Sequence, residues 1–317
     1  MRDNDKPSSP ICVLGFGRSG TSLTMRVLNL LGVYVGPAED LMLAHDTDNP
    51  RGYWEPQWMA DLNDEILALL GTTWWQPLRA APGWEGTPDL APLRERARSL
   101  LEEKFGAAAL WGWKEPRTTL TLPFWRVLTP NARYVICLRN PVDAIASIRR
   151  RPEPDLPAGE WGDLWLEYTA RALQETQDSH RLIVFYEDFF LEPQLQIARI
   201  ASFLGVQPPR DDLLDSSPLL REAIEQSLRH HATPLLDLAA ANDIVPSTRL
   251  LFLALRAAES LRRGQPQASS DNALVADAIE RAAPELWQER LAAASVQPLS
   301  GAAGPGWRLW NGQVGAI

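Results

Sequence analysis

The sequence is poor in the residues that build disulfides, metal sites and basic surfaces. It has only two cysteines, Cys12 and Cys137, and each lies inside an apolar run typical of a strand. Two buried, reduced thiols are therefore expected rather than a disulfide, and no metal-ligand spacing is present. Lysine and arginine total 31 against 40 aspartate and glutamate residues, a net charge of −9. This lack of basic excess argues against nucleic acid or an anionic membrane as the main partner.

Long apolar segments, internal repeats and low-complexity tracts are also missing. No run is long enough to cross a membrane, and the polar start MRDNDKPSSP has no apolar signal region. We therefore expect a cytoplasmic protein without a transmembrane segment, and nothing in the sequence predicts its oligomeric state. A hydrophobic content of 45% over 317 residues is enough for a sizeable core.

What the sequence does contain is a strand, a glycine-rich loop and a helix in direct succession. Ile11–Leu14 is a short apolar strand, and apolar residues recur at helical spacing from Leu23 to Leu31. Glycines let backbone N–H groups approach an anion, and the start of the helix directs further N–H groups to the same point. The candidate anion-binding residues are Gly17, Arg18, Ser19, Gly20, Thr21 and Ser22.

This loop departs from the nucleoside-triphosphate pattern at an important position. Gly15 and Gly20 match the spacing of G-x-x-x-x-G-K-[ST], but Thr21 stands where the lysine belongs, and the basic residue is Arg18. An ordinary NTPase is therefore disfavoured, and a different phosphate-rich donor is favoured. A tight turn without a ligand is the alternative.

Strand-like and helical patterns alternate along the first two thirds of the chain. This alternation predicts an α/β, P-loop-like three-layer fold with a mostly parallel central sheet, followed by a helical C-terminal extension. Because ligands of such sheets bind at the carboxyl ends of the strands, Arg18, Lys114, Arg139 and Tyr186 are expected to converge. The expected strands are 11–14, 32–36, 108–113, 132–138 and 182–186.

Two regions are expected in the chain. Residues 1–210 form the α/β core, and residues 211–317 form a helical region packed on it, with helices at 245–263 and 272–294.

Four segments accompany the glycine-rich loop, and their order is informative. They are Gly52-Tyr53-Trp54-Glu55, Lys114-Glu115-Pro116-Arg117, the run from Arg139 to Ser147 that reads RNPVDAIAS, and Tyr186-Glu187-Asp188. With these segments the chain resembles the sulfotransferases that use 3′-phosphoadenosine 5′-phosphosulfate (PAPS). It looks most like their bacterial soluble branch with GYWE and K-[DE]-P-R segments, over about residues 11–205.

The resemblance implies roles for these residues. The loop would hold the 5′-phosphosulfate through Arg18 and the N–H groups of Gly17 to Ser22. Arg139 and Ser147 would hold the 3′-phosphate, unless Arg139 pairs at the surface with Asp143 instead. Tyr186 either contacts the adenine or packs in the core. The product would be the bisphosphate PAP, and no metal is needed.

Lys114 would neutralise charge on the departing phosphate, or would form a buried structural pair with a neighbouring acid. Arg117 binds donor or acceptor, or caps the next helix. The animal enzymes' late R-K-G segment is missing here. Arg229-His230-His231 either replaces it or forms a solvated basic patch.

The resemblance also requires a general base for the acceptor hydroxyl. The candidates are Glu55, which we prefer because it lies in the motif beside Trp54, and His45 in the preceding loop. The predicted reaction is in-line transfer of a sulfonate to a small-molecule, sugar or glycolipid alcohol. The alternatives are an ATP-dependent kinase and a nucleotide-binding module without activity.

Overall fold

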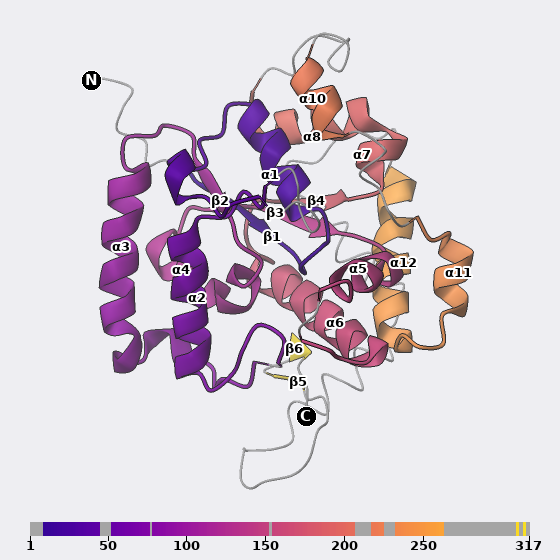
Figure 1. The fold of residues 1–317 in the computed structure, drawn as a ribbon, viewed down its shortest axis with the longest axis horizontal. Coiled ribbons are helices and arrows are strands. Elements are labelled where there is room, and N and C mark those ends of the chain that lie inside the picture. The colour runs from indigo at the N-terminus through magenta and orange to yellow at the C-terminus, as the bar shows by residue number, and fades with distance from the viewer. Residues whose placement is uncertain are drawn as a thin grey trace, which may run out of the picture.

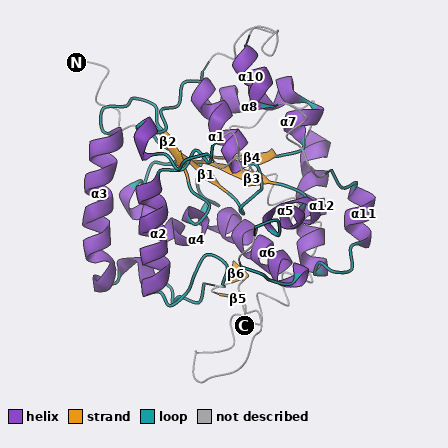
Figure 2. Ribbon diagram, in the orientation of Figure 1, coloured by secondary structure: helices purple, strands orange, loops and turns teal. Residues whose placement is uncertain are grey.

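A parallel four-stranded sheet forms the centre of the computed structural model. The structure describes residues 9–44, 52–76, 78–151, 154–206, 217–224, 232–262, 309–310 and 313–314. The strands are β1 (Ile11–Leu14), β2 (Gly112–Lys114), β3 (Arg133–Leu138) and β4 (Arg181–Phe185). All neighbours in the order β2-β1-β3-β4 are parallel (Figure 2). The carboxyl ends of all four strands therefore meet at one edge of the sheet.

Helices connect the strands and cover both faces of the sheet (Figure 1). They are α1 (Thr21–Leu30), α2 (Gln57–Leu69), α3 (Ala91–Phe105), α4 (Thr118–Leu128), α5 (Pro141–Ile148), α6 (Ala158–Glu175), α7 (Asp188–Leu191), α8 (Pro193–Leu204), α10 (Pro218–Ala223), α11 (Leu235–Ala240) and α12 (Pro246–Arg262). Short 3-10 turns occur at Ala38–Asp40, Trp84–Gly86 and Pro88–Leu90, and β5 (Leu309–Trp310) pairs antiparallel with β6 (Gln313–Val314).

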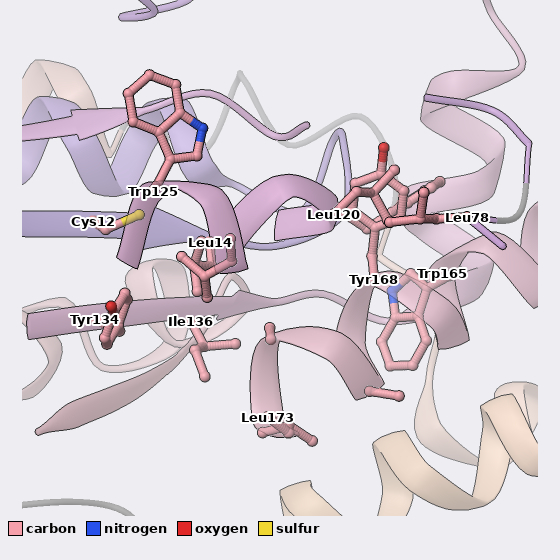
Figure 3. Close-up of a cluster of buried hydrophobic side chains, with 14 of the residues drawn as sticks. Cys12, Leu14, Leu78, Leu120, Trp125, Tyr134, Ile136, Trp165, Tyr168 and Leu173 are labelled. Atoms are coloured by element: carbon pink, nitrogen blue, oxygen red, sulfur yellow. The ribbon is translucent and has the colours of Figure 1, made fainter. Parts of the chain in front are cut away.

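The core has two layers because side chains alternate across the strands. Cys12 and Leu14 of β1 lie in the layer that contains residues of α2, α4 and α6, together with Ile136 of β3 (Figure 3). Ile11 and Val13 point the other way, into a layer formed with α1 and α8. This period of two is what a strand covered on both faces requires. The α/β three-layer prediction is confirmed.

Two of the expected strands are shorter in the structure. In 32–36 only Tyr34 forms a bridge, with Trp111, and the expected strand 108–113 begins at Gly112. The helix expected at 272–294 and the boundary near residue 210 lie outside the described residues. Within the described C-terminal part, α12 packs against α6.

Both cysteines are buried and free, as predicted. Among the helices that the structure describes, none has the length and apolarity needed to span a bilayer.

Candidate active site

The glycine-rich loop joins β1 to α1 through three residues with positive φ. These are Gly15 at 144°, Arg18 at 68° and Gly20 at 87°. At Gly15 a Cβ atom would lie 2.6 Å from the Cys137 carbonyl oxygen, so a side chain cannot be accommodated. Gly20 occupies the N-cap of α1 and offers no side chain to cap its first N–H groups. Those groups are therefore suited to bind an anion.

Arg139, which follows β3, lies directly beside this loop. Its Nη1 donates a 3.0 Å hydrogen bond to the Arg18 carbonyl oxygen. The Arg18 side chain continues the contact, since its Nε donates to Ser147 Oγ at 3.0 Å from α5. The loop and the RNPVDAIAS segment thus form one continuous surface, although Arg18 and Ser147 are 129 residues apart in the chain.

Tyr186 closes the other side of Arg139. The guanidinium carbon of Arg139 lies 4.3 Å from the centroid of the Tyr186 ring, a cation–π distance. The same ring packs so closely on the loop that a Cβ atom at Gly20 would lie 2.4 Å from Tyr186 Cδ2. Arg18, Arg139 and Tyr186 are therefore brought together at the strand ends. Tyr186 is 9% exposed, so its ring is largely buried.

The alternative of a surface pair between Arg139 and Asp143 is wrong. Arg139 is only 5% exposed, and among the described residues it forms no ion pair with Asp143. Asp143 instead accepts hydrogen bonds from the backbone N–H and the hydroxyl of Thr233. Arg139 is left facing the loop.

Two buried polar atoms at this site lack a protein partner. Arg139 Nε and Ser19 Oγ make no hydrogen bond within the part of the chain that the structure describes. A buried donor without a partner costs about 1–3 kcal/mol, so such atoms mark a place where a polar ligand is expected. Their position on the loop and after β3 fits an anionic group.

Lys114 ends β2 and forms a second cluster at the start of α1. The side chain is 1% exposed, and its Nζ forms an ion pair with Glu55. Nζ also donates to Ser22 Oγ at 3.1 Å, and that hydroxyl donates to the Tyr53 carbonyl oxygen at 3.0 Å. Burial lowers the pKa of Lys114 below its usual value, and the neighbouring Glu55 carboxylate opposes this shift. The buried pair with a neighbouring acid, the alternative role given for Lys114, is thus present, and it joins the predicted cation to the predicted base.

The backbone on both sides holds Glu55 in place. The preceding Trp54 has a φ of 60°, and its ring lies 4.7 Å from the Arg26 guanidinium carbon. The Glu55 carbonyl oxygen accepts a 2.8 Å hydrogen bond from the Met42 N–H. Glu55 lies before α2, which begins at Gln57, so it is not part of that helix. The other base candidate, His45, lies outside the described residues, as does Arg229-His230-His231.

Glu115, next to Lys114, is a site residue that the sequence reasoning did not single out. Its carboxylate accepts hydrogen bonds from Asn63 Nδ2 at 2.6 Å and from Arg117 Nη1 at 2.8 Å. Burial raises the pKa of Glu115 to about 7, although the Arg117 charge opposes the shift. Arg117 also pairs with Asp64 at 2.8 Å. An acid immediately after a strand was the available signal, but its partner Asn63 on α2 could not be read from spacing.

Several solved structures are similar to this chain. The sulfotransferase domain from the Synechococcus PCC 7002 olefin synthase is 19% identical, covering 73% of this chain and 91% of that one, with a TM-score of 0.40. The sulfotransferase domain from the curacin biosynthetic pathway is 16% identical, covering 83% and 100%, with a TM-score of 0.44. Retinol dehydratase in complex with androsterone and PAP is 17% identical, covering 75% and 68%, with a TM-score of 0.35.

The family assignment rests on the sequence alone. No curated protein matches the chain. A family model described as "Sulfotransferase family" matches residues 10–211, which include the loop and every described segment named above up to Asp188. The chain belongs to the sulfotransferase family, which confirms the enzyme class predicted from its motifs.

Proposed function

We propose that this sulfotransferase moves the sulfonate group of PAPS to the hydroxyl of a small-molecule, sugar or glycolipid acceptor. The observation that carries the proposal is the contact between the two anion-binding segments. Arg139 donates to the Arg18 carbonyl oxygen, and the Arg18 side chain donates to Ser147. A single donor that carries a phosphate on each side of its adenosine fits such a joined surface. Two unrelated anion sites would not need to be in contact with each other.

The two ends of the donor are assigned from the positions of the cations. The N–H groups from Gly17 to Ser22 and the hydroxyls of Thr21 and Ser22 lie at the start of α1, which suits the 5′-phosphosulfate. Arg139 and Ser147 suit the 3′-phosphate. We place the Arg18 guanidinium with them because of its contact with Ser147. In this assignment Arg18 supplies positive charge at the 3′-phosphate, where the animal enzymes use R-K-G.

Lys114 and Glu55 supply the chemistry at the other end. Bound PAPS provides an activated sulfonate whose departing group is a phosphate. Glu55 takes the proton of the acceptor hydroxyl as the acceptor oxygen bonds to sulfur. The sulfur–oxygen bond to the phosphate breaks, its electron pair stays on the phosphate oxygen, and the Lys114 ammonium neutralises that charge. PAP is the second product, and no resident metal takes part.

The contact between Lys114 and Glu55 supports this division of labour. Lys114 also reaches Ser22 in the first turn of α1, at 3.1 Å, so one buried cation touches both the loop and the base. An acceptor hydroxyl that approaches Glu55 is then close to a group bound at the start of α1. Proximity of this kind removes much of the entropic cost of the reaction.

Titration calorimetry with the wild-type protein tests the donor. We expect PAP to bind without magnesium. PAP should also bind at least about tenfold more tightly than ATP with magnesium, because its 3′-phosphate makes contacts that ATP lacks, worth at least about 1.4 kcal/mol. Magnesium-dependent ATP binding without PAP binding would instead favour a kinase. A screen of sugar, lipid and phenolic alcohols with the donor-loaded enzyme then identifies the acceptor.

We also propose that residues 1–210 form the donor-binding core, that residues 211–317 form a helical region packed on it, and that the enzyme works in the cytoplasm.

A further inference from the structure

Arg256 on α12 makes a bidentate contact with the Tyr186-Glu187-Asp188 segment. Its two terminal nitrogens donate to the two Asp188 carboxylate oxygens at 2.6 and 2.5 Å. The contact is largely buried, since the side chains of Arg256 and Asp188 are 13% and 3% exposed. The guanidinium carbon also lies 4.7 Å from the Phe185 ring centroid. Arg256 lies beyond residue 211, where the family match ends.

Asp188 belongs to a short segment that contacts Arg139 and its neighbour Asn140. Asp188 begins α7, two residues after Tyr186. The Tyr186 N–H donates to the Leu138 carbonyl oxygen at 2.8 Å, which continues the pairing of β3 and β4. Glu187 Oε1 accepts a 2.9 Å hydrogen bond from the Asn140 N–H, next to Arg139. A shift of Asp188 would therefore move the Tyr186 ring and with it the cation that it covers.

The buried fork between Arg256 and Asp188 is well suited to prevent such a shift. Two parallel N–H···O bonds fix the carboxylate in orientation as well as in position, which a single contact does not do. The fork is anchored on a 17-residue helix that packs against α6, so the anchor itself is firmly held. The short α7 has only four residues and little stability of its own.

We propose that Arg256 is a positioning residue for the donor site: through Asp188 it holds Tyr186 against Arg139 and so orients the guanidinium for the 3′-phosphate. This inference rests on the proposed function, because it assigns a 3′-phosphate to Arg139. It adds a residue from the C-terminal helices to a site whose other members all lie within residues 10–211.

The test compares Arg256→Gln with Arg199→Gln. Arg199 on α8 is a matched control, because it is also mostly buried, also contacts α12 through Glu259 at 3.3 Å, and also reaches β4 through the Ile183 carbonyl oxygen. Two ligands are titrated by calorimetry: PAP, and adenosine 5′-phosphosulfate, which lacks the 3′-phosphate. Loss of positioning in Arg256→Gln should weaken PAP binding about tenfold, which is about 1.4 kcal/mol. The affinity for adenosine 5′-phosphosulfate should fall clearly less. Arg199→Gln should bind both ligands as the wild type does.

A second background separates positioning from general loss of stability. If Arg256 acts through Arg139, adding Arg256→Gln to Arg139→Gln should change PAP affinity by less than about twofold. Full additivity of the two changes would overturn the inference, and so would an equal loss for both ligands in Arg256→Gln. If Arg256→Gln does not fold, Arg256→Lys takes its place, with weaker but still ligand-selective loss expected because one contact remains. A wild type that fails to bind PAP would overturn the proposed function instead.

Discussion

Replacing Glu55 by glutamine separates the chemical step from donor binding. Glutamine has nearly the same shape and keeps an oxygen that can accept from Lys114, but it cannot take a proton at neutral pH. The loss of a general base is expected to lower kcat by about 10²–10⁴. This corresponds to about 2.7–5.4 kcal/mol of transition-state stabilisation.

Glu55→Gln should leave PAP affinity unchanged or increase it, in contrast to its loss of kcat. Glu55 is 7% exposed and carries a negative charge in contact with Lys114, next to the proposed anion site. Removing that charge leaves the Lys114 ammonium less neutralised, so PAP affinity should stay the same or increase. Removing one partner of a buried ion pair typically costs about 3–5 kcal/mol of stability. The cost is expected to be smaller here, because glutamine keeps an oxygen that can accept a hydrogen bond from Lys114 Nζ.

The assay measures PAP release at saturating donor and acceptor, with PAP affinity and urea unfolding determined in parallel. Glu167→Gln is the control, because Glu167 is a fully buried carboxylate paired with Arg171 at 2.9 Å on α6. It should lose stability without the large fall in kcat. A Glu55→Gln enzyme that keeps kcat within about twofold would refute the assignment, since a general base contributes far more. His45→Ala would then be the next variant to measure.

Two further predictions concern the loop and the network beside it. Gly20→Ala should weaken PAP binding about tenfold or more, because the new Cβ would lie 2.4 Å from Tyr186 Cδ2. Gly32→Ala is the control, because Gly32 has a similar φ of 97° but its Cβ would meet nothing within 4 Å; it should lower only the stability, by about 1–2 kcal/mol. Glu115 has a raised pKa of about 7 in the folded protein. Between about pH 4.5 and 7 the folded state therefore keeps a proton that the unfolded state has lost, so the free energy of unfolding should fall as the pH rises through this window. In Glu115→Gln, the free energy of unfolding measured by unfolding curves across this pH range should depend less on pH. An unchanged pH dependence would mean that another group titrates in this window.

The sequence was a good guide to the elements that carry long, regular patterns. The strand expected at 132–138 and the helix expected at 245–263 were found almost to the residue, as β3 (Arg133–Leu138) and α12 (Pro246–Arg262), because their apolar periods are sustained. The segment 32–36 misled, because Val33 and Val35 are buried by packing and not by strand pairing. A short apolar run has the same pattern in both situations.

The candidate site was predictable where one rule governs it and not elsewhere. Because parallel strands end at a common edge, the meeting of Arg18, Arg139 and Tyr186 followed from their places after predicted strands. Lys114 was expected to join them, but it contacts Glu55 and Ser22 in a separate cluster. The contacts that hold the site together could not be predicted in this way. Ser147 meets the Arg18 side chain, and Arg256 meets Asp188 across 68 residues. Such contacts depend on how helices pack in three dimensions, and no local pattern records that.

The net charge of the chain is a poor guide to the charges at its candidate site. The chain carries −9 overall, yet Lys114 and Arg139 are 1% and 5% exposed at the strand ends. Charges on the surface are screened by salt within about 8 Å, whereas buried cations act on a bound anion with little screening. Each of these two cations also faces a buried acid, Glu55 or Glu187. These acids therefore offset part of the positive charge at the strand ends before a donor binds. In the proposed function, the remaining negative charge of a bound donor is balanced by the N–H groups of the loop and by Arg18, so that an acidic protein could hold an anionic donor without a basic surface.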